Sequence, residues 1–207
     1  MKEYIRLLPM VFDPNLAAQI GEAVIGATRP LLQWCDVLES VPEESISGIL
    51  VPYSRYGIKK NGSFLWAPDV MEFLETQYGT SVLALTNLEV LQEDGTLVYG
   101  HHRLLEGHAR PTGGIIVSSA HLLRELEARD EETGIERIVS QALHEIGEFS
   151  GLEEHGGPPF PNVKGKLCPM VVAKSFMETT GRTSADYLKT TGIGYCSDCK
   201  NKLLIFQ

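Results

Sequence analysis

The sequence has little of what several classes of protein require. Four cysteines in 207 residues are too few for a secreted disulfide framework. Lysine and arginine number 18 against 27 aspartates and glutamates, so a net charge of −9 leaves few cations for a phosphate backbone. The longest apolar runs, such as residues 113–117, are far shorter than the roughly 20 residues of a membrane span. We therefore expect a protein that binds neither nucleic acid nor a membrane.

The first twelve residues also lack the apolar core of a signal peptide, because Lys2, Glu3 and Arg6 interrupt them. We expect a soluble, cytoplasmic protein. Its 43% hydrophobic and 22% charged residues are typical of a globular domain. A chain of this length can bury a sufficient core without disulfides.

The spacing of apolar residues predicts a mixed array of strands and helices. Strands are expected over 3–8, 81–91 and 113–119, and helices over 16–27, 68–76, 122–128 and 135–149, with an acidic break at 130–133. Residues 30–41 and 47–51 are ambiguous and are expected to supply a second strand and its connection. This pattern is typical of an α/β fold.

The composition changes after Gly151. The segment 156–161, Gly-Gly-Pro-Pro-Phe-Pro, is incompatible with regular structure, and the residues beyond 151 hold three of the four cysteines. We expect residues 1–151 to form a body of sheet and helices and residues 152–207 to form a smaller C-terminal part. The two parts are expected to share one compact domain.

The segment 144–155, His-Glu-Ile-Gly-Glu-Phe-Ser-Gly-Leu-Glu-Glu-His, contains the most informative residues. His144 and Glu148 are four residues apart, so on a helix their side chains share one face and can converge on a metal ion. Glu145 lies beside that face and can hold a water molecule. The ordinary alternative is a solvated acidic helix end, with His144 paired by a hydrogen bond.

Gly151 is a typical helix-terminating residue, because glycine readily adopts a left-handed backbone. A chain that turns there can bring Glu154 or His155 back toward the helix. The sequence leaves open which of the two faces the metal, because a slip of one residue exchanges them.

The same segment resembles the metzincin zinc signature, His-Glu-x-x-His-x-x-Gly-x-x-His. His144, Glu145 and Gly151 match it. Glu148 and Glu154 stand where the second and third zinc histidines are expected.

Later motifs are similar to those of archaemetzincins, a metzincin-like family in which a cysteine follows the third zinc ligand and Cys-x-Met and Cys-x-x-Cys come after it. His155 stands at the first cysteine position, Cys168-Pro169-Met170 matches Cys-x-Met, and 196–199 matches the closing pair. Residues 107–121, with Gly-Gly-Ile-Ile-Val-Ser-Ser, also resemble the strand and loop ahead of the active-site helix. The similarity is densest from 113 to 199.

The resemblance implies a metzincin-like zincin fold: a twisted, mostly parallel sheet, an active-site helix and a small zinc-bearing C-terminal part. It also implies a catalytic metal site in which His144, Glu148 and Glu154 are ligands and Glu145 is the general base. Met170 would form the Met-turn beneath the metal. The expected function is an archaemetzincin-like metal-dependent peptidase that acts on a peptide or protein substrate.

A second, structural zinc site is implied at His155, Cys168, Cys196 and Cys199, a ligand set of the closed Cys3His type. The alternatives for these cysteines are free thiols, or a redox pair that forms a reversible disulfide between Cys196 and Cys199. Cys35 is expected to be an ordinary core cysteine.

The altered ligands change the expected chemistry of the first site. One imidazole and two carboxylates neutralise a divalent cation, so its bound water is less acidic than with three imidazoles. Carboxylates also favour Mn²⁺ or Fe²⁺ over a strict zinc preference. We expect a peptidase that is weaker and has a higher pH optimum, or an inactive relative that keeps the structural zinc and binds peptides or proteins. His101, His102, His108 and His121 show no metal-binding spacing among themselves, and His101 and His102 are expected on a strand or the surface.

Overall fold

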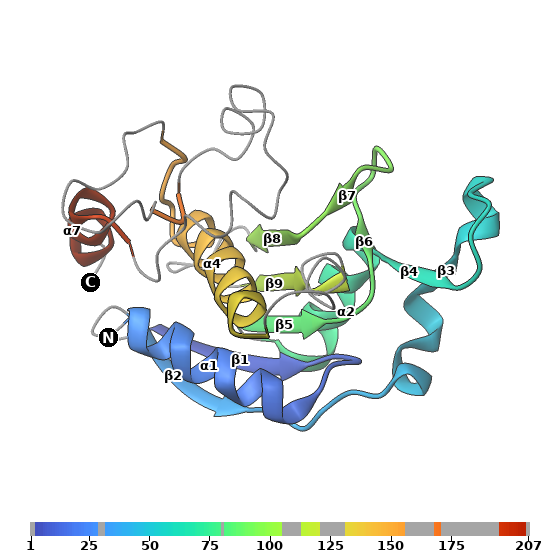
Figure 1. The fold of residues 1–207 in the computed structure, drawn as a ribbon, viewed down its shortest axis with the longest axis horizontal. Coiled ribbons are helices and arrows are strands. Elements are labelled where there is room, and N and C mark those ends of the chain that lie inside the picture. Colours follow the sequence, from blue (N-terminus) through green and yellow to red (C-terminus); the bar gives the residue numbers. More distant parts are fainter. Residues whose placement is uncertain are drawn as a thin grey trace.

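The computed structural model describes residues 3–28, 32–79, 81–104, 113–120, 131–155, 168–170 and 195–205. Its main sheet has five strands in the order β2-β1-β5-β9-β8 (Figure 1). These strands are β1 (Glu3–Pro9), β2 (Leu32–Val37), β5 (Val82–Thr86), β8 (Gly100–Leu104) and β9 (Gly113–Ser118). The first four in sheet order are parallel, and β8 joins the edge antiparallel to β9.

Helices cover both faces of this sheet. Helices α1 (Pro14–Thr28) and α4 (Glu131–Phe149) lie on one face, and α2 (Ala67–Tyr78) lies on the other (Figure 1). Alternate strand residues supply the two cores: Leu83 and Leu85 pack with α1 and α4, whereas Val82 and Ala84 pack with α2. All residues of β5 and β9 are buried, as expected for parallel strands covered on both faces.

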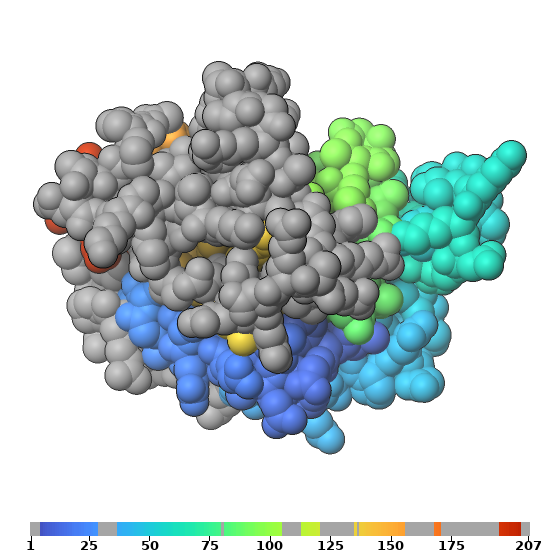
Figure 2. All heavy atoms as spheres, viewed as in Figure 1, coloured from blue at the N-terminus to red at the C-terminus, as the bar shows by residue number. Residues whose placement is uncertain are grey.

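A second, smaller sheet was not predicted. It has the order β3-β4-β6-β7 and projects at the right in Figures 1 and 2. Its strands are β3 (Leu50–Pro52), β4 (Ser63–Trp66), β6 (Val90–Leu91) and β7 (Leu97–Val98), preceded or joined by the 3-10 helices η1 (Glu43–Ile49) and η2 (Tyr53–Tyr56). The ambiguous segment 47–51 therefore ends a 3-10 helix and begins β3, while 30–41 contains β2.

Two predicted boundaries were wrong. The single strand expected over 81–91 is divided between β5 and β6, which belong to different sheets. The division occurs at Leu88, whose amide donates to Thr86 Oγ1 and whose carbonyl accepts from Ser118 Oγ. The acidic break expected at 130–133 is also wrong from Glu131 onward, because α4 begins at that residue. Acidic residues are favourable in the first turn of a helix, where they interact with the positive end of its dipole. The helix expected over 122–128 lies outside the described residues.

The described C-terminal residues pack onto the body of the fold. Helix α7 (Ser197–Ile205) and the buried side chains of Met170, Tyr195 and Leu203 belong to the same hydrophobic cluster as α4. The boundary between parts at residue 151 stays a prediction. Across the described ranges, no helix combines the length and apolarity needed to cross a membrane.

Candidate metal centres

The C-terminal half of α4 brings polar side chains to the edge strand β8. Its inner residues, among them Leu143 and Ile146, are buried in the core. The helical repeat therefore leaves His144 and Glu148 on a partly exposed face, with side chains 17% and 28% exposed. Glu145 is 4% exposed and lies beside them.

Glu154 returns to this helix face after the chain reverses at Gly151. Gly151 has φ 82°, a left-handed conformation that glycine adopts without the steric cost of a side chain. His144 Nε2 lies 3.6 Å from Glu148 Oε2 and 3.7 Å from Glu154 Oε1. Ligand atoms of a tetrahedral metal site are about 3.4 Å apart when the metal–ligand bonds are about 2.1 Å. The donor atoms and their spacing therefore fit a divalent cation.

A carbonyl fixes the orientation of the His144 ring. Its Nδ1 lies 2.8 Å from the Pro169 carbonyl oxygen. A carbonyl only accepts, so Nδ1–H donates and the lone pair of Nε2 faces the two carboxylates. Metal-binding histidines commonly have such a partner on the second ring nitrogen.

Glu145 is held by neighbours on two elements. Gln141 Nε2 donates to Glu145 Oε1 at 2.8 Å, and His102 Nδ1 lies 3.0 Å from Glu145 Oε2. Gly100 makes room for this side chain, since a Cβ added at residue 100 would lie 2.6 Å from the Glu145 Cγ.

The position of His102 was missed by reasoning from the sequence. As expected, His102 lies on a strand, β8. Its Nδ1, however, contacts Glu145 and also lies 3.5 Å from Glu148 Oε2. Only the pairing of β8 with β9 and the packing of α4 bring residues 102 and 145 together. The sequence offers no local signal for this contact.

The crowded carboxylates shift the pKa values at this site. Burial raises the pKa of Glu148, and the negative charges of Glu145 and Glu154 raise it further, against the opposing effect of His144 and His102. Burial lowers the pKa of His102, but the hydrogen bond to Glu145 and the charges of Glu145 and Glu148 outweigh it, so this pKa is raised. A divalent cation would reverse the balance for Glu148 by favouring its ionised form.

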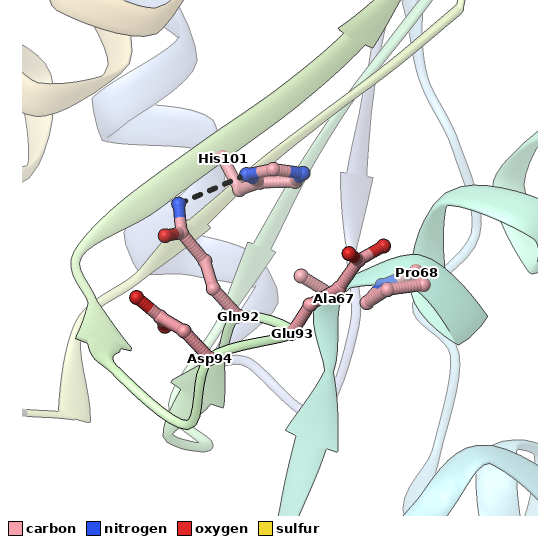
Figure 3. A pocket seen from close by; sticks show the side chains of 6 residues that line it. All are labelled: Ala67, Pro68, Gln92, Glu93, Asp94 and His101. Atoms are coloured by element: carbon pink, nitrogen blue, oxygen red, sulfur yellow. Dashed lines mark hydrogen bonds between the residues drawn. The ribbon is translucent and has the colours of Figure 1, made fainter.

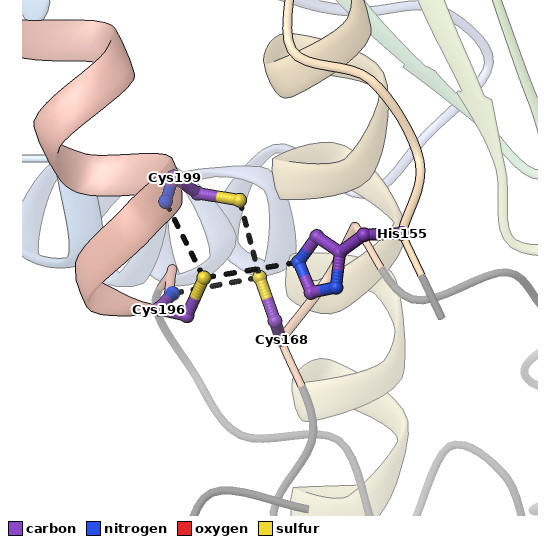
Figure 4. A group of neighbouring side chains, drawn as sticks. All are labelled: His155, Cys168, Cys196 and Cys199. Atoms are coloured by element: carbon purple, nitrogen blue, oxygen red, sulfur yellow. Dashed lines mark hydrogen bonds between the residues drawn. The ribbon is translucent and has the colours of Figure 1, made fainter. Parts of the chain in front are cut away.

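The four residues of the predicted structural site also lie together (Figure 4). Cys196 precedes α7, Cys199 lies in its first turn, and the His155 amide donates to the Met170 carbonyl at 2.8 Å. Cys168 Sγ is 3.8 Å from Cys199 Sγ, and Cys196 Sγ is 3.7 Å from His155 Nε2. The sulfur–sulfur distance matches the separation of about 3.8 Å between two sulfurs bound to one zinc ion at about 2.3 Å, and the sulfur–nitrogen distance is close to the value of about 3.6 Å for a sulfur and an imidazole nitrogen on one zinc ion.

The sulfur atoms of this group are buried and close together. Cys168, Cys196 and Cys199 are free thiols. Burial raises the pKa of Cys168 and of Cys199, and the charge of Cys168 adds to the shift at Cys199. Thiolates packed this closely are costly without a cation, and a bound metal removes that cost. The side chain of Cys35, on β2, and residues His108 and His121 lie outside what the structure describes.

A cavity of about 300 Å³ adjoins the far side of β8 (Figure 3). It is lined by Ala67, Pro68, Gln92, Glu93, Asp94 and His101. His101 Nδ1 contacts Gln92 Nε2 at 3.3 Å, and the His101 ring centroid is 6.5 Å from that of His102. Glu93 and Asp94, both exposed, give this cavity an acidic rim.

Three solved structures share this fold. Archaemetzincin from Methanopyrus kandleri has a TM-score of 0.62 at 19% identity, covering 99% of this chain and 95% of that chain. Archaemetzincin from Archaeoglobus fulgidus, complexed with malonate, has a TM-score of 0.62 at 17% identity, covering 96% and 99%. A zinc-dependent peptidase from Methanocorpusculum labreanum gives 0.58 at 17% identity, with the same coverage.

These matches confirm the predicted fold class: the chain has the mixed α/β archaemetzincin fold over nearly its whole length. Comparison with sequence models of protein families gives no match, and comparison with curated protein sequences gives none either. The roles of the individual ligand residues stay predictions.

Proposed function

We propose that this protein is a metal-dependent peptidase related to the archaemetzincins, with a carboxylate-rich catalytic centre. The observation that carries the proposal is the convergence of His144, Glu148 and Glu154, whose ligand atoms lie within 4.8 Å of one another, with the His144 ring fixed by Pro169. A divalent cation held there supplies a Lewis acid for the peptide carbonyl and acidifies a water molecule.

Glu145 is the general base in this proposal. Its carboxylate accepts the proton of the attacking water and passes it to the leaving amine. Gln141 and His102 hold the two carboxylate oxygens in place, and burial excludes competing water. Substrates are peptides or proteins in this proposal.

His155, Cys168, Cys196 and Cys199 form a structural zinc site in the same proposal. Three thiolates and an imidazole are typical of closed zinc sites, which stabilise a fold and leave no open position for substrate. A small, loop-rich C-terminal part gains most from such a site.

Hydrolysis of a peptide by the protein reconstituted with Zn²⁺, Mn²⁺ or Fe²⁺ tests the proposal. Glu145→Gln should abolish hydrolysis and leave the metal at the group of His144, Glu148 and Glu154 and at the cysteines in place. Glu153→Gln is the matched control, because Glu153 is exposed and belongs to neither ligand group. Full activity of the Glu145 variant would exclude its role as base.

The second candidate is a catalytically inactive relative that binds peptides or proteins. The replacement of two zinc histidines by Glu148 and Glu154 favours it. Elemental mass spectrometry on protein purified without added metal separates the two. One zinc per chain and no hydrolysis with any of the three cations would support the binding module.

A further inference from the structure

A second group of ligand atoms lies beside the proposed catalytic metal site. His102 Nδ1 and one carboxylate oxygen each from Glu145 and Glu148 all lie within 4.8 Å of one another. Glu148 Oε2 is shared: it lies 3.5 Å from His102 Nδ1 and 3.6 Å from His144 Nε2. The same carboxylate therefore stands between two imidazoles.

The arrangement fits two cations better than one. Among the described residues, no group of ligand atoms within 4.8 Å contains both His102 and His144. Each histidine instead has its own second carboxylate, Glu145 or Glu154. In two-metal sites the ions are about 3.5–4 Å apart and commonly share a ligand. Glu148 Oε2 lies near both histidines and has two lone pairs, so this oxygen can bridge the two ions.

The second group is built on rigid elements. His102 lies on β8, paired with Ile115 of β9, and both glutamates lie on α4. Glu145 is 4% exposed and is aimed at His102 from the helix, in space that Gly100 leaves free. The donors would need little movement to close around an ion.

Charge favours a second cation after the first. Glu145, Glu148 and Glu154 contribute three negative charges, so one divalent cation leaves one of them to be balanced by a proton on His102 or by a second cation that displaces that proton. An imidazole with two carboxylates suits Zn²⁺, Mn²⁺ and Fe²⁺. A neighbouring cation repels the second ion, which is why we expect weaker binding at this group than at the first.

We propose that His102, Glu145 and Glu148 form a second divalent-cation site, bridged through Glu148 to the first, whose occupation inhibits the enzyme. Inhibition follows because a cation on the Glu145 carboxylate occupies the lone pairs that accept the proton of the attacking water. The site itself stands on its own geometry, whereas the inhibitory effect rests on the proposed peptidase function.

The test is a Mn²⁺ titration of this chain, already carrying zinc at the cysteines, followed by electron paramagnetic resonance. We expect two Mn²⁺ per chain and the signature of a spin-coupled pair. His102→Gln should retain one ion, lose the coupled signal and weaken the second binding step at least tenfold. His101→Gln is the matched control, because His101 lies on the same strand and belongs to neither group.

An activity titration then separates this inference from the proposed function. With peptidase activity present, added Zn²⁺ should activate and then inhibit, and His102→Gln should shift inhibition to at least tenfold higher Zn²⁺. Two coupled ions, with no hydrolysis at any metal concentration, including those at which only the first site is filled, would support the site and reject the peptidase. Wild-type protein that binds at most one Mn²⁺, or a His102 variant that still binds two, would overturn the second site.

Discussion

The two ligand groups near the C-terminal end of α4 differ in donor type and in exposure. The open group, His144, Glu148 and Glu154, offers hard oxygen donors, and the Glu154 side chain is 40% exposed. The sulfur group, His155 with Cys168, Cys196 and Cys199, offers soft sulfur donors, and all three cysteines are buried. A buried sulfur site gains stability from zinc, whereas an open carboxylate site can exchange its ion and admit a substrate.

The largest effect is expected when a cysteine of the sulfur group is replaced. Cys199→Ser should lower zinc affinity by orders of magnitude and cost several kcal/mol of unfolding free energy, because metal binding at such a site is coupled to folding. Zinc content and thermal unfolding measure both effects. Asn201→Ala, an exposed change on the same helix, should alter neither. Unchanged zinc content in the Cys199 variant would exclude that thiol as a ligand.

A second prediction replaces the carboxylate ligands of the open group by softer imidazoles, which should make its metal preference more like that of the sulfur group. The double change Glu148→His and Glu154→His should raise zinc affinity by about 10- to 100-fold and shift the metal preference from Mn²⁺ toward Zn²⁺. The less neutralised zinc should also lower the pH optimum of hydrolysis. Competition with a zinc chelator and a pH–rate profile provide the measurements. No zinc uptake by the double variant would show that these two positions do not correspond to the zinc histidines of the signature.

A smaller loss of unfolding free energy is expected from a substitution where α4 packs against Met170 and Tyr195. In Gly147→Ala, the new Cβ would collide with Met170 Sδ and lie 3.2 Å from Tyr195 Cε1. Overpacking of this kind costs about 1–3 kcal/mol, against a gain in helix propensity of about 1 kcal/mol. Gly26→Ala in α1 is the control, since no atom lies within 4 Å of its new Cβ. Denaturant unfolding should show a lower free energy of unfolding for Gly147→Ala and a slightly higher one for Gly26→Ala. Equal effects of the two substitutions would refute the packing argument.

The smallest effect concerns the metal-free open group. The folded state raises the pKa of Glu148, chiefly through burial, so the metal-free protein should lose stability as pH rises from the ordinary glutamate pKa through that raised pKa. Glu148→Gln should remove this loss, with a gain of less than about 1 kcal/mol near pH 7 because solvent screens the site. Thermal unfolding with a chelator present, from pH 4 to 8, measures it. A variant with the pH dependence of the wild type would contradict the assignment to Glu148.

Local spacing explains what could be predicted from the sequence. The positions of His144, Glu145 and Glu148 follow from the helical repeat, and the cysteine motifs follow from their order along the chain. The choice between Glu154 and His155 needed the backbone after Gly151, where Glu154 turns to His144 and His155 turns to the cysteines. Periodicity does not reveal such a reversal.

Contacts between distant elements account for the rest. His102 reaches Glu145 only because β8 pairs antiparallel with β9 and α4 packs against both. The division of 81–91 likewise depends on Ser118, which binds the Leu88 carbonyl from another strand. These are consequences of sheet register, which a single sequence does not encode in a readable pattern.

The turn of Cys168, Pro169 and Met170 has a consequence for how the two groups acquire metal. Cys168 belongs to the sulfur group, the Pro169 carbonyl holds the His144 ring, and the Met170 carbonyl accepts the His155 amide. Zinc at the sulfur group would therefore pre-orient a ligand of the open group, and thermodynamic linkage makes the effect mutual. Cellular zinc supply would then control the readiness of a centre whose carboxylates favour manganese or iron.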